Sequence, residues 1–490
     1  MENVIKNLLV DESAIEVSIR IPIDFEGSDV MAHLGNEGQI EHAVREAGRV
    51  ATEAMFQKVA DKHNKKQHFM SAENFKFRQD DRNEQTFVSP YGHIRISRPH
   101  FYNDHLKKGA TPFEDETRMQ DHRITPLAQY LLLESLAEKG PQATAEDFER
   151  KRGIRVSHHL VDEFLEDFGT KYQDERRALL DTVIREDWRP KWRSGPVGVE
   201  VESPEEDSAG LHLMEALHSE MQRPVLPMVQ ADAMKVGIRE YEECLKDGRI
   251  NYNKYQIRWR ELDNAVVGFV APDGPREPNE KVTLLERQYF SEYYSPDSLP
   301  STTEQYLRAC GVKSGAKILL HGDGDPAIWR RYAEAFEDYV RVEILDERHA
   351  RLNLRVMADI FYPEETGKAP DWVERRLTEL YEGRYDSFFN ALNYLVRSAK
   401  QEDGKGLRTK RKYFRKNKNR IRYQDFLNSG YPISTCFVES SHNHVIGTRV
   451  RKNGRSYRAD RLQIIADIRC EFKSKRLPYV FENVIKSTPN

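Results

Sequence analysis

Five segments between residues 225 and 346 have the apolar composition of β-strands, and they constrain the fold of this chain more than any other feature. They are residues 225–232, 255–262, 265–271, 317–323 and 339–346. The first three follow one another directly, whereas a helical stretch at 303–310 precedes the fourth. Three strands in succession, followed by alternating helix and strand, predict a mixed α/β sheet with flanking helices.

That order is the one expected of a ribonuclease-H-like core, which we place at residues 225–476. Pro, Gly, Ser and acidic residues cluster in the preceding stretch and predict a linker over 191–224. Residues 477–490 are expected to form a tail. With 490 residues the chain is long enough for two or three domains.

Residues 1–120 predict one long helix and one β-hairpin. Apolar residues recur at helical spacing from about 39 to 66, which indicates an amphipathic helix. Two alternating runs within 85–102 flank the turn Pro90-Tyr-Gly92, which is typical of a hairpin.

Residues 121–190 predict a second helical block. Within it, Gly153 is placed to end one helix and Ser157 to cap the next. Such a pair could be a helix-turn-helix that enters a DNA major groove, or an ordinary helical hairpin. The sequence leaves both interpretations open.

Three observations set the broad class of the chain. No apolar run approaches the roughly 18 residues that span a bilayer, and the N-terminus lacks the pattern of a secretory signal. The 4 cysteines lie far apart without a CxxC pair, so we expect neither a zinc ribbon nor a disulfide framework. These features predict a cytoplasmic protein without a membrane partner.

Positive charge is concentrated near the C-terminus, although the net charge of the chain is −4. Residues 405–476 contain 20 Lys and Arg against 5 Asp and Glu, and residues 405–422 contain ten basic residues and no acid. A segment of this kind indicates a polyanionic partner such as nucleic acid, although a solvated helical face would look the same.

Three acids stand where a phosphoryl-transfer site could form. Asp232 and Asp323 each end an apolar strand segment, and Gly322 and Gly324 flank the second of them. Glu439 follows a Gly-x-Pro-Ile-Ser turn, between the two basic stretches. Carboxylates are suitable ligands for Mg²⁺, and two such ions can activate an attacking hydroxyl and stabilise a leaving oxygen.

These motifs, in this order, resemble bacterial insertion-sequence transposases of the Kra and Lre types, a branch of the DDE group. The resemblance covers most of the chain and is densest from 230 to 469. It is carried, in order, by Asp232, Trp259-Arg-Glu261, Gly322-Asp-Gly324 with Ile328-Trp329, Asp346-x-x-His349-Ala350, Asn419-Arg420 with Tyr423, Gly430-x-Pro-Ile-Ser434, Val438-Glu-Ser440, Lys452-Asn-Gly454 and Ile468-Arg469.

The resemblance implies a ribonuclease-H-like fold with a helical insertion at about 350–428. Asp232, Asp323 and Glu439 would be the catalytic, metal-binding triad. His349 would support the site or be a structural histidine. Asp325 is a rival to Asp323, and Asp346 is either a further strand-end acid or a helix N-cap.

The chain departs from the family pattern at two places. The family's Cys pair after the first hairpin is missing, so no zinc is expected, and Ile433-Ser-Thr-Cys436 replaces the usual Ser-Gly.

The predicted function is therefore that of a DNA transposase that uses Mg²⁺, or Mn²⁺ in its place, and acts as a homo-oligomer on DNA in the nucleoid. Two alternatives remain: a transposase-derived DNA-binding regulator that is no longer catalytic, and a ribonuclease-H-like nuclease without strand transfer. The predicted DNA-binding residues are Lys405, Arg408, Lys410, Arg411, Lys412, Arg415, Lys416, Arg420, Arg422, Arg449, Arg451 and Lys452.

Overall fold

The computed structural model describes residues 5–11, 13–21, 30–64, 68–70, 75–119, 122–185, 224–241, 254–272, 274–294, 297–362, 367–399, 404–434, 437–451 and 456–487. The chain forms two compact units, one of residues 1–172 with 478–490 and one of residues 173–477. The predicted linker, apart from Pro224, lies outside the described residues. None of the helices built from the described residues combines the length and apolar character needed to span a bilayer.

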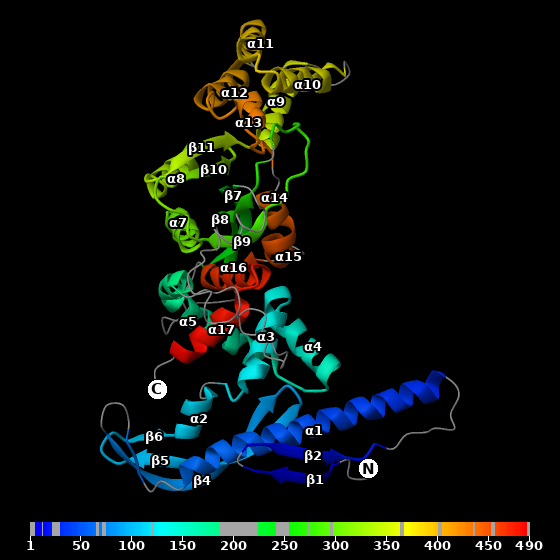
Figure 1. The fold of residues 1–490 in the computed structure, drawn as a ribbon, viewed down its shortest axis with the longest axis vertical. Helices are drawn as coiled ribbons and strands as arrows, with labels where there is room; N and C mark the ends of the chain where they lie inside the picture. The colour runs from blue at the N-terminus through cyan, green and yellow to red at the C-terminus, as the bar shows by residue number, and fades with distance from the viewer. Residues whose placement is uncertain are drawn as a thin grey trace. The chain divides into compact units, whose positions relative to one another are not determined.

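The first unit places one long helix against an antiparallel sheet (Figure 1). Its strands and helices are β1 (Ile5–Val10), β2 (Ile15–Ile19), α1 (Val30–Asn64), β3 (His68–Met70), β4 (Lys76–Ser89), β5 (Gly92–Asn103), β6 (Lys108–Ala110), α2 (Pro112–Thr117), α3 (Pro126–Glu138), α4 (Pro141–Arg152), α5 (His158–Arg185) and α17 (Leu477–Ser487). β1 pairs with β2, and β3 to β6 form a sheet in chain order. The long helix and the hairpin are confirmed, although α1 begins well before residue 39.

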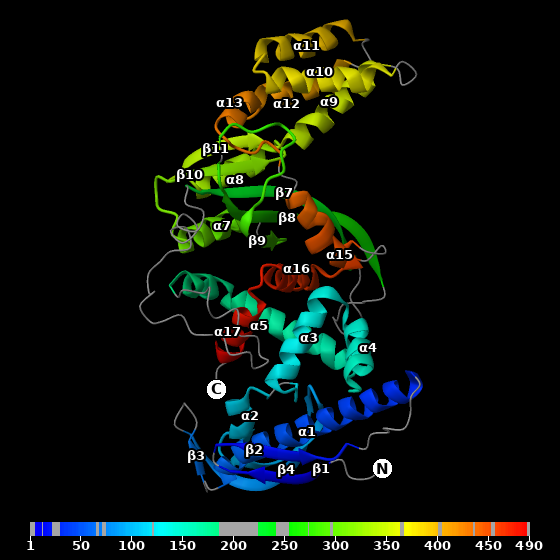
Figure 2. The ribbon, with the colours of Figure 1, turned by 45° about the vertical axis from the view of Figure 1, so that its right-hand side comes forward.

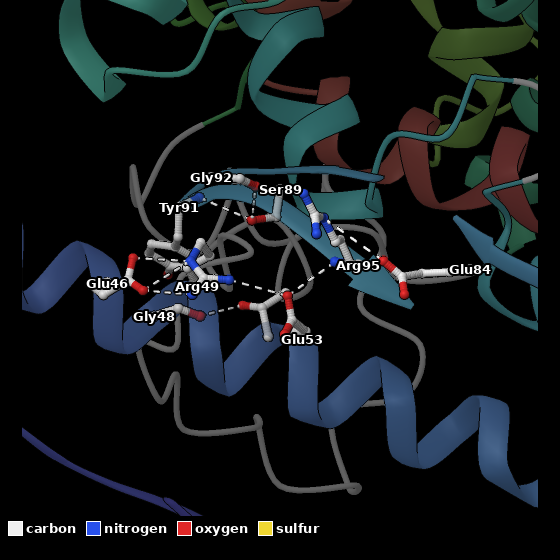
Figure 3. A network of polar contacts seen from close by, with 10 residues as sticks. Glu46, Gly48, Arg49, Glu53, Glu84, Ser89, Tyr91, Gly92 and Arg95 are labelled. Atoms are coloured by element: carbon white, nitrogen blue, oxygen red, sulfur yellow. Dashed lines mark hydrogen bonds and ion pairs between the residues drawn. The ribbon is translucent and has the colours of Figure 1, made fainter. Parts of the chain in front are cut away.

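Polar contacts join α1 to the hairpin (Figure 3). Arg49 forms ion pairs with Glu46 and Glu53 on its own helix, and Glu53 accepts a hydrogen bond from the backbone N–H of Arg95 on β5 at 3.0 Å. Gly48 faces the ring of Tyr91, where an added Cβ would lie only 2.7 Å from a ring carbon. Glycine is therefore required here for the helix to approach the hairpin turn.

The predicted helix-turn-helix consists of α4 and α5. Gly153 ends α4 with a left-handed φ of 64°, and the Ser157 hydroxyl accepts a hydrogen bond from the N–H of Leu160 at 3.1 Å. Both predicted end signals are confirmed. The predicted tail is a helix, α17, whose Phe481 packs on Tyr130 and Phe168.

The second unit is built on a six-stranded mixed sheet with the order β11-β10-β7-β8-β9, and β12 pairs separately with β7 (Figure 2). Its strands are β7 (Leu226–Tyr241), β8 (Tyr255–Val270), β9 (Leu285–Glu292), β10 (Lys317–Gly322), β11 (Val340–Leu345) and β12 (Ser456–Tyr457). β7, β8 and β9 are antiparallel neighbours, whereas β10 is parallel to both β7 and β11.

Two predicted strands, 255–262 and 265–271, are one continuous strand, β8, and this part of the prediction is wrong. Asp263 and Asn264 looked like a break, but they pair with Ala233 and Asp232 across the ladder. The third antiparallel strand is instead β9, which the sequence analysis missed. Pairing with a long neighbour keeps polar residues in the strand despite their weak strand preference.

Helices of the second unit flank the sheet and extend it at the β11 edge. They are α7 (Ser298–Ala309), α8 (Pro326–Ala335), α9 (Glu347–Phe361), α10 (Lys368–Tyr381), α11 (Tyr385–Ser398), α12 (Gly404–Lys416), α13 (Tyr423–Asn428), α14 (Phe437–Ser440), the π-helix η4 (Ser441–Ile446), α15 (Gly447–Val450) and α16 (Ala459–Lys473). α9 to α13 gather into a helical layer around one apolar core in the region where an insertion was expected (Figures 1 and 2). Phe388, Leu392 and Phe414 are fully buried in that core.

Candidate active site

Asp232 lies in the interior of β7, not at a strand end as predicted. β7 continues to Tyr241 because β8 pairs with it along its whole length. The other neighbour, β10, pairs with β7 only from Met228 to Gln230. Asp232 therefore stands just beyond the point where β7 parts from its parallel neighbour.

Asp323 directly follows β10, as predicted. The last parallel pair between β10 and β7 joins His321 to Gln230, so Asp323 and Asp232 each lie two residues beyond it. Parallel strands in register carry such residues to the same level of the sheet. The register thus brings together two of the three predicted catalytic acids.

Asp346 continues this row on the third parallel strand. It follows β11 directly, and the pair before it joins Leu345 to Gly322. Its side chain caps α9 by accepting a hydrogen bond from the N–H of Arg348 at 3.0 Å. The structure thus gives Asp346 the N-cap position, at the level of Asp323.

Asp325 caps the next helix and leaves Asp323 as the acid of the row. The Asp325 carboxylate accepts a hydrogen bond from the N–H of Ala327 at 2.7 Å, at the start of α8. The N–H of Asp325 donates to Oδ1 of Asp323 at 2.8 Å. Asp325 therefore orients Asp323 instead of replacing it.

Glu439 lies on α14, and a buried glutamine ties that helix to the sheet. Oε1 of Gln230 accepts a hydrogen bond from the N–H of Val438 at 3.0 Å, and its Nε2 donates to Oδ2 of Asp346 at 3.0 Å. One side chain thus links β7, the start of α9 and α14. Glu439 itself forms an ion pair with Arg348 of α9.

Two histidines flank Asp232. Nε2 of His349 lies 3.7 Å from Oδ2 of Asp232, and Nδ1 of His442 lies 3.8 Å from the same oxygen. Burial, followed by the charges of Arg451 and His349, lowers the pKa of His442 to about 4. His442 is therefore neutral at neutral pH and presents an imidazole, not a cation, to the acid.

The sequence analysis missed Gln230 and His442. No local pattern marks Gln230, because its two partners are distant in sequence. A signal for His442 did exist: it follows Glu439 by three residues, a spacing that places two side chains on one helical face.

The acids create an electronegative site. Burial raises the pKa of Asp232 to about 7, and the negative charges of Asp323, Asp346 and Asp263 raise it further. A like-charged cluster of this kind favours either a proton or a bound cation. Perturbed carboxyl groups at strand ends are typical of functional sites.

The donor set fits Mg²⁺ in part. Within the described residues, no group of three His, Cys, Asp or Glu side chains is arranged to hold a metal ion. Mg²⁺, however, usually takes one or two protein carboxylates, several waters and phosphate oxygens of the substrate. Asp232 and Asp323 supply such a pair, whereas Glu439 is held by Arg348.

The loop after β10 leaves open backbone beside the acids. Gly324 has a left-handed φ of 95°, and a Cβ there would lie 2.5 Å from the ring of Tyr413. The Tyr413 hydroxyl donates to the backbone oxygen of Asp323 at 2.6 Å. Burial, followed by the charges of Asp323 and Asp346, raises the pKa of Tyr413, so the hydroxyl stays protonated and fixes the loop.

The predicted DNA-binding residues fall into two groups. Seven lie on α12, and among the described residues none of them forms an ion pair. Lys410 donates to Asn353, and Arg411 and Arg415 both donate to Asn393. The seven are Lys405, Arg408, Lys410, Arg411, Lys412, Arg415 and Lys416.

The structure does not place the other five on one basic surface. Arg420 pairs with Glu343 at 2.6 Å and Arg422 pairs with Asp425, so their charges are neutralised locally. Arg449 is only 2% exposed and donates to Tyr457, so its predicted surface role is wrong. Arg451 is exposed and donates to the backbone oxygen of Lys235. Lys452 lies outside the described residues.

Comparisons with known proteins give one weak structural likeness. No protein-family model and no curated protein matches the chain. Among solved structures, the chain is similar to a Drosophila P element transposase strand transfer complex, with a TM-score of 0.29 and 10% sequence identity over 71% of this chain and 92% of that one. At this TM-score the likeness carries no argument about fold or chemistry.

Proposed function

We propose that the second unit is a ribonuclease-H-like core and that the protein is a metal-dependent DNA transposase of the Kra and Lre type. One observation carries the proposal: Asp232 and Asp323 stand level at the point where the parallel strands part, with Glu439 held nearby through Gln230. The strand order β9-β8-β7-β10-β11 supports the core assignment, because antiparallel strands precede the strand-helix alternation.

Asp232, Asp323 and Glu439 would hold the divalent cations, Mg²⁺ or Mn²⁺. Bound cations would activate an attacking hydroxyl and stabilise the leaving oxygen of a phosphodiester. The protein's own contribution is positioning: Asp325 orients Asp323 through its backbone N–H, and Tyr413 fixes the loop beside it. Glu439 becomes available as a ligand when Arg348 releases it, and the neutral His442 excludes water beside Asp232.

Helix α12 would bind the DNA phosphates. Its cations lack carboxylate partners among the described residues, and Tyr413 on the same helix contacts the Asp323 loop. A strand held on α12 would therefore run next to the acids. Phosphate contacts of this kind provide most of the affinity of a protein for DNA and make binding dependent on salt.

The complete reaction would free a 3′ hydroxyl at each end of a DNA element and join it to target DNA. Because two ends must be held together, we infer a homo-oligomer on DNA, acting at the nucleoid of the cytoplasm. The reading of the ends by α4 and α5 belongs to the same proposal.

The test is a cleavage and strand-transfer assay with Mg²⁺ or Mn²⁺ on DNA that carries the sequences flanking the gene. Asp323→Asn should abolish nicking and joining and leave DNA binding within about twofold, since α12 is intact. Asp325→Asn is the matched control, because Asn caps a helix as well as Asp does.

Three other outcomes would reject the proposal. Cut products without joined ones would indicate a nuclease without strand transfer. Tight DNA binding without cleavage in the wild type would indicate a regulator derived from a transposase. Equal loss of cleavage in both Asn variants would contradict the choice of Asp323 over Asp325.

A further inference from the structure

A groove lies between α10 and α11 in the helical layer, apart from the acids. Its volume is about 680 Å³, within the roughly 300–1,000 Å³ that is usual for ligand sites. Three aromatic side chains line it: Tyr362 after α9, Trp372 on α10 and Tyr394 on α11. Trp372 is 7% exposed and forms part of the wall, whereas Tyr394 is 63% exposed.

Polar groups lie between these rings. The guanidinium of Arg376 lies 5.4 Å from the centre of the Trp372 ring, and it is held in place by two hydrogen bonds of 2.6 Å to Glu379. Arg375 and Asn390 also line the groove. A planar cation and an amide beside aromatic rings can hydrogen bond to the edge of a stacked heterocycle.

The polar face of α11 leads from the groove to a cluster of arginines. Asn390, Tyr394 and Arg397 follow at intervals of four and three residues, which places them on one helical face. Arg411 on α12 lies among the charges of Arg415, Arg397 and Arg408, which, after burial, lower its pKa.

None of these four arginines forms an ion pair within the parts of the chain that the structure describes. Arg411 and Arg415 share Oδ1 of Asn393 at 3.2 Å each. Like charges gathered without a counter-charge favour a bound polyanion. A ring-lined groove that continues into such a cluster matches the chemistry of a nucleotide: a base and its phosphates.

We propose that the groove between α10 and α11 binds an unpaired nucleobase of a DNA strand, stacked between Tyr394 and Trp372, while Arg397, Arg408, Arg411 and Arg415 hold the adjoining phosphates. The inference rests on the proposed function for the identity of the nucleic acid. It assigns to the helical layer a role that the acid site does not perform. A base can occupy the groove only when it is outside a duplex, either in a single strand or flipped from a helix.

The experiment measures the affinity of the full chain for single-stranded DNA of about 12 nucleotides, a length that an aromatic and basic site can cover. The probe carries one 2-aminopurine, and a second probe carries an abasic site at the same position. The wild type should bind the first probe about tenfold more tightly than the second, since stacking of one base is worth roughly 1–3 kcal/mol. It should also change the fluorescence of the 2-aminopurine.

Tyr394→Ala should remove that preference, and Tyr394→Phe should retain it. The matched control is Tyr294→Ala, because Tyr294 is a similarly exposed tyrosine, at 53%, outside the groove. A duplex probe with the 2-aminopurine opposite an abasic site tests a flipped base, and a fully paired duplex should lose nothing on Tyr394→Ala. Equal binding of both single-stranded probes by the wild type, or full preference in Tyr394→Ala, would overturn the proposal.

Cleavage of the end DNA, measured in parallel, separates this inference from the proposed function. A wild type that does not cleave but loses the base preference on Tyr394→Ala would refute the transposase and leave the groove assignment standing. Normal cleavage and joining without any base preference would refute the groove assignment alone.

Discussion

Arg348 of α9 forms an ion pair with Glu439 of α14, so the third predicted catalytic acid is held by a cation of the protein itself. The same α9 N-terminus is capped by Asp346, which Gln230 ties to the sheet. The position of Glu439 is therefore coupled to that of the strands. A metal ion at Glu439 has to compete with Arg348.

This competition predicts that Arg348→Met raises the affinity for Mn²⁺ about threefold, because a partly exposed ion pair is worth up to roughly 1 kcal/mol. Mn²⁺ titration followed by electron paramagnetic resonance measures the affinity. Arg351→Met is the control, since Arg351 lies one turn further along α9 and pairs with Glu347 instead. An unchanged or weaker affinity in Arg348→Met would show that Glu439 does not bind the ion.

Replacement of Gln230 by Leu should lower the free energy of unfolding by about 3 kcal/mol. The change leaves the N–H of Val438 and the carboxylate of Asp346 without a hydrogen bond from this buried side chain. Urea unfolding measures the loss. The same change at Gln256, an exposed residue of β8, should have little effect. Equal stability of the two variants would contradict the linking role of Gln230.

Asp467 on α16 should make stability depend on pH. Burial raises the pKa of Asp467 to about 7, although Arg176 lies 3.3 Å away and Gln463 donates a hydrogen bond to it. A carboxyl group whose pKa is raised in the folded state stabilises the protein fully below about pH 4. This contribution is lost as the pH rises through 7.

Asp467→Asn should therefore gain stability relative to the wild type between pH 5 and 8, by at most about 1.4 kcal/mol per pH unit. Thermal unfolding at a series of pH values tests this, with Asp460→Asn on the same helix as control. A constant difference between variant and wild type over this range would count against the raised pKa.

Exposed cations of α12 should determine how strongly DNA binding depends on salt. Lys405, Lys412 and Lys416 are exposed. The triple Gln variant should lose up to about three counterions from the slope of log affinity against log salt, at roughly 0.9 for each phosphate contact. Arg422→Gln is the control, because Arg422 is already paired with Asp425. An unchanged slope in the triple variant would place the DNA elsewhere.

The sequence alone determined the features that depend on neighbouring residues. The strand before Asp323, the end of α4 at Gly153 and the unbroken basic run of α12 were all predicted. Each follows from local chemistry: an apolar run, a residue that tolerates a left-handed φ, and a helix without acids. The expected order of three strands followed by alternation was correct as well, although two of the segments were assigned wrongly.

Only the tertiary structure decided which residues meet. Asp232 lies inside a strand because β8 pairs with β7 beyond it, and Arg449 is buried against Tyr457 although it sits in a basic stretch. Gln230 gains its role from partners 116 and 208 residues away. Such contacts depend on strand register and helix packing over the whole unit, which no short stretch of sequence encodes.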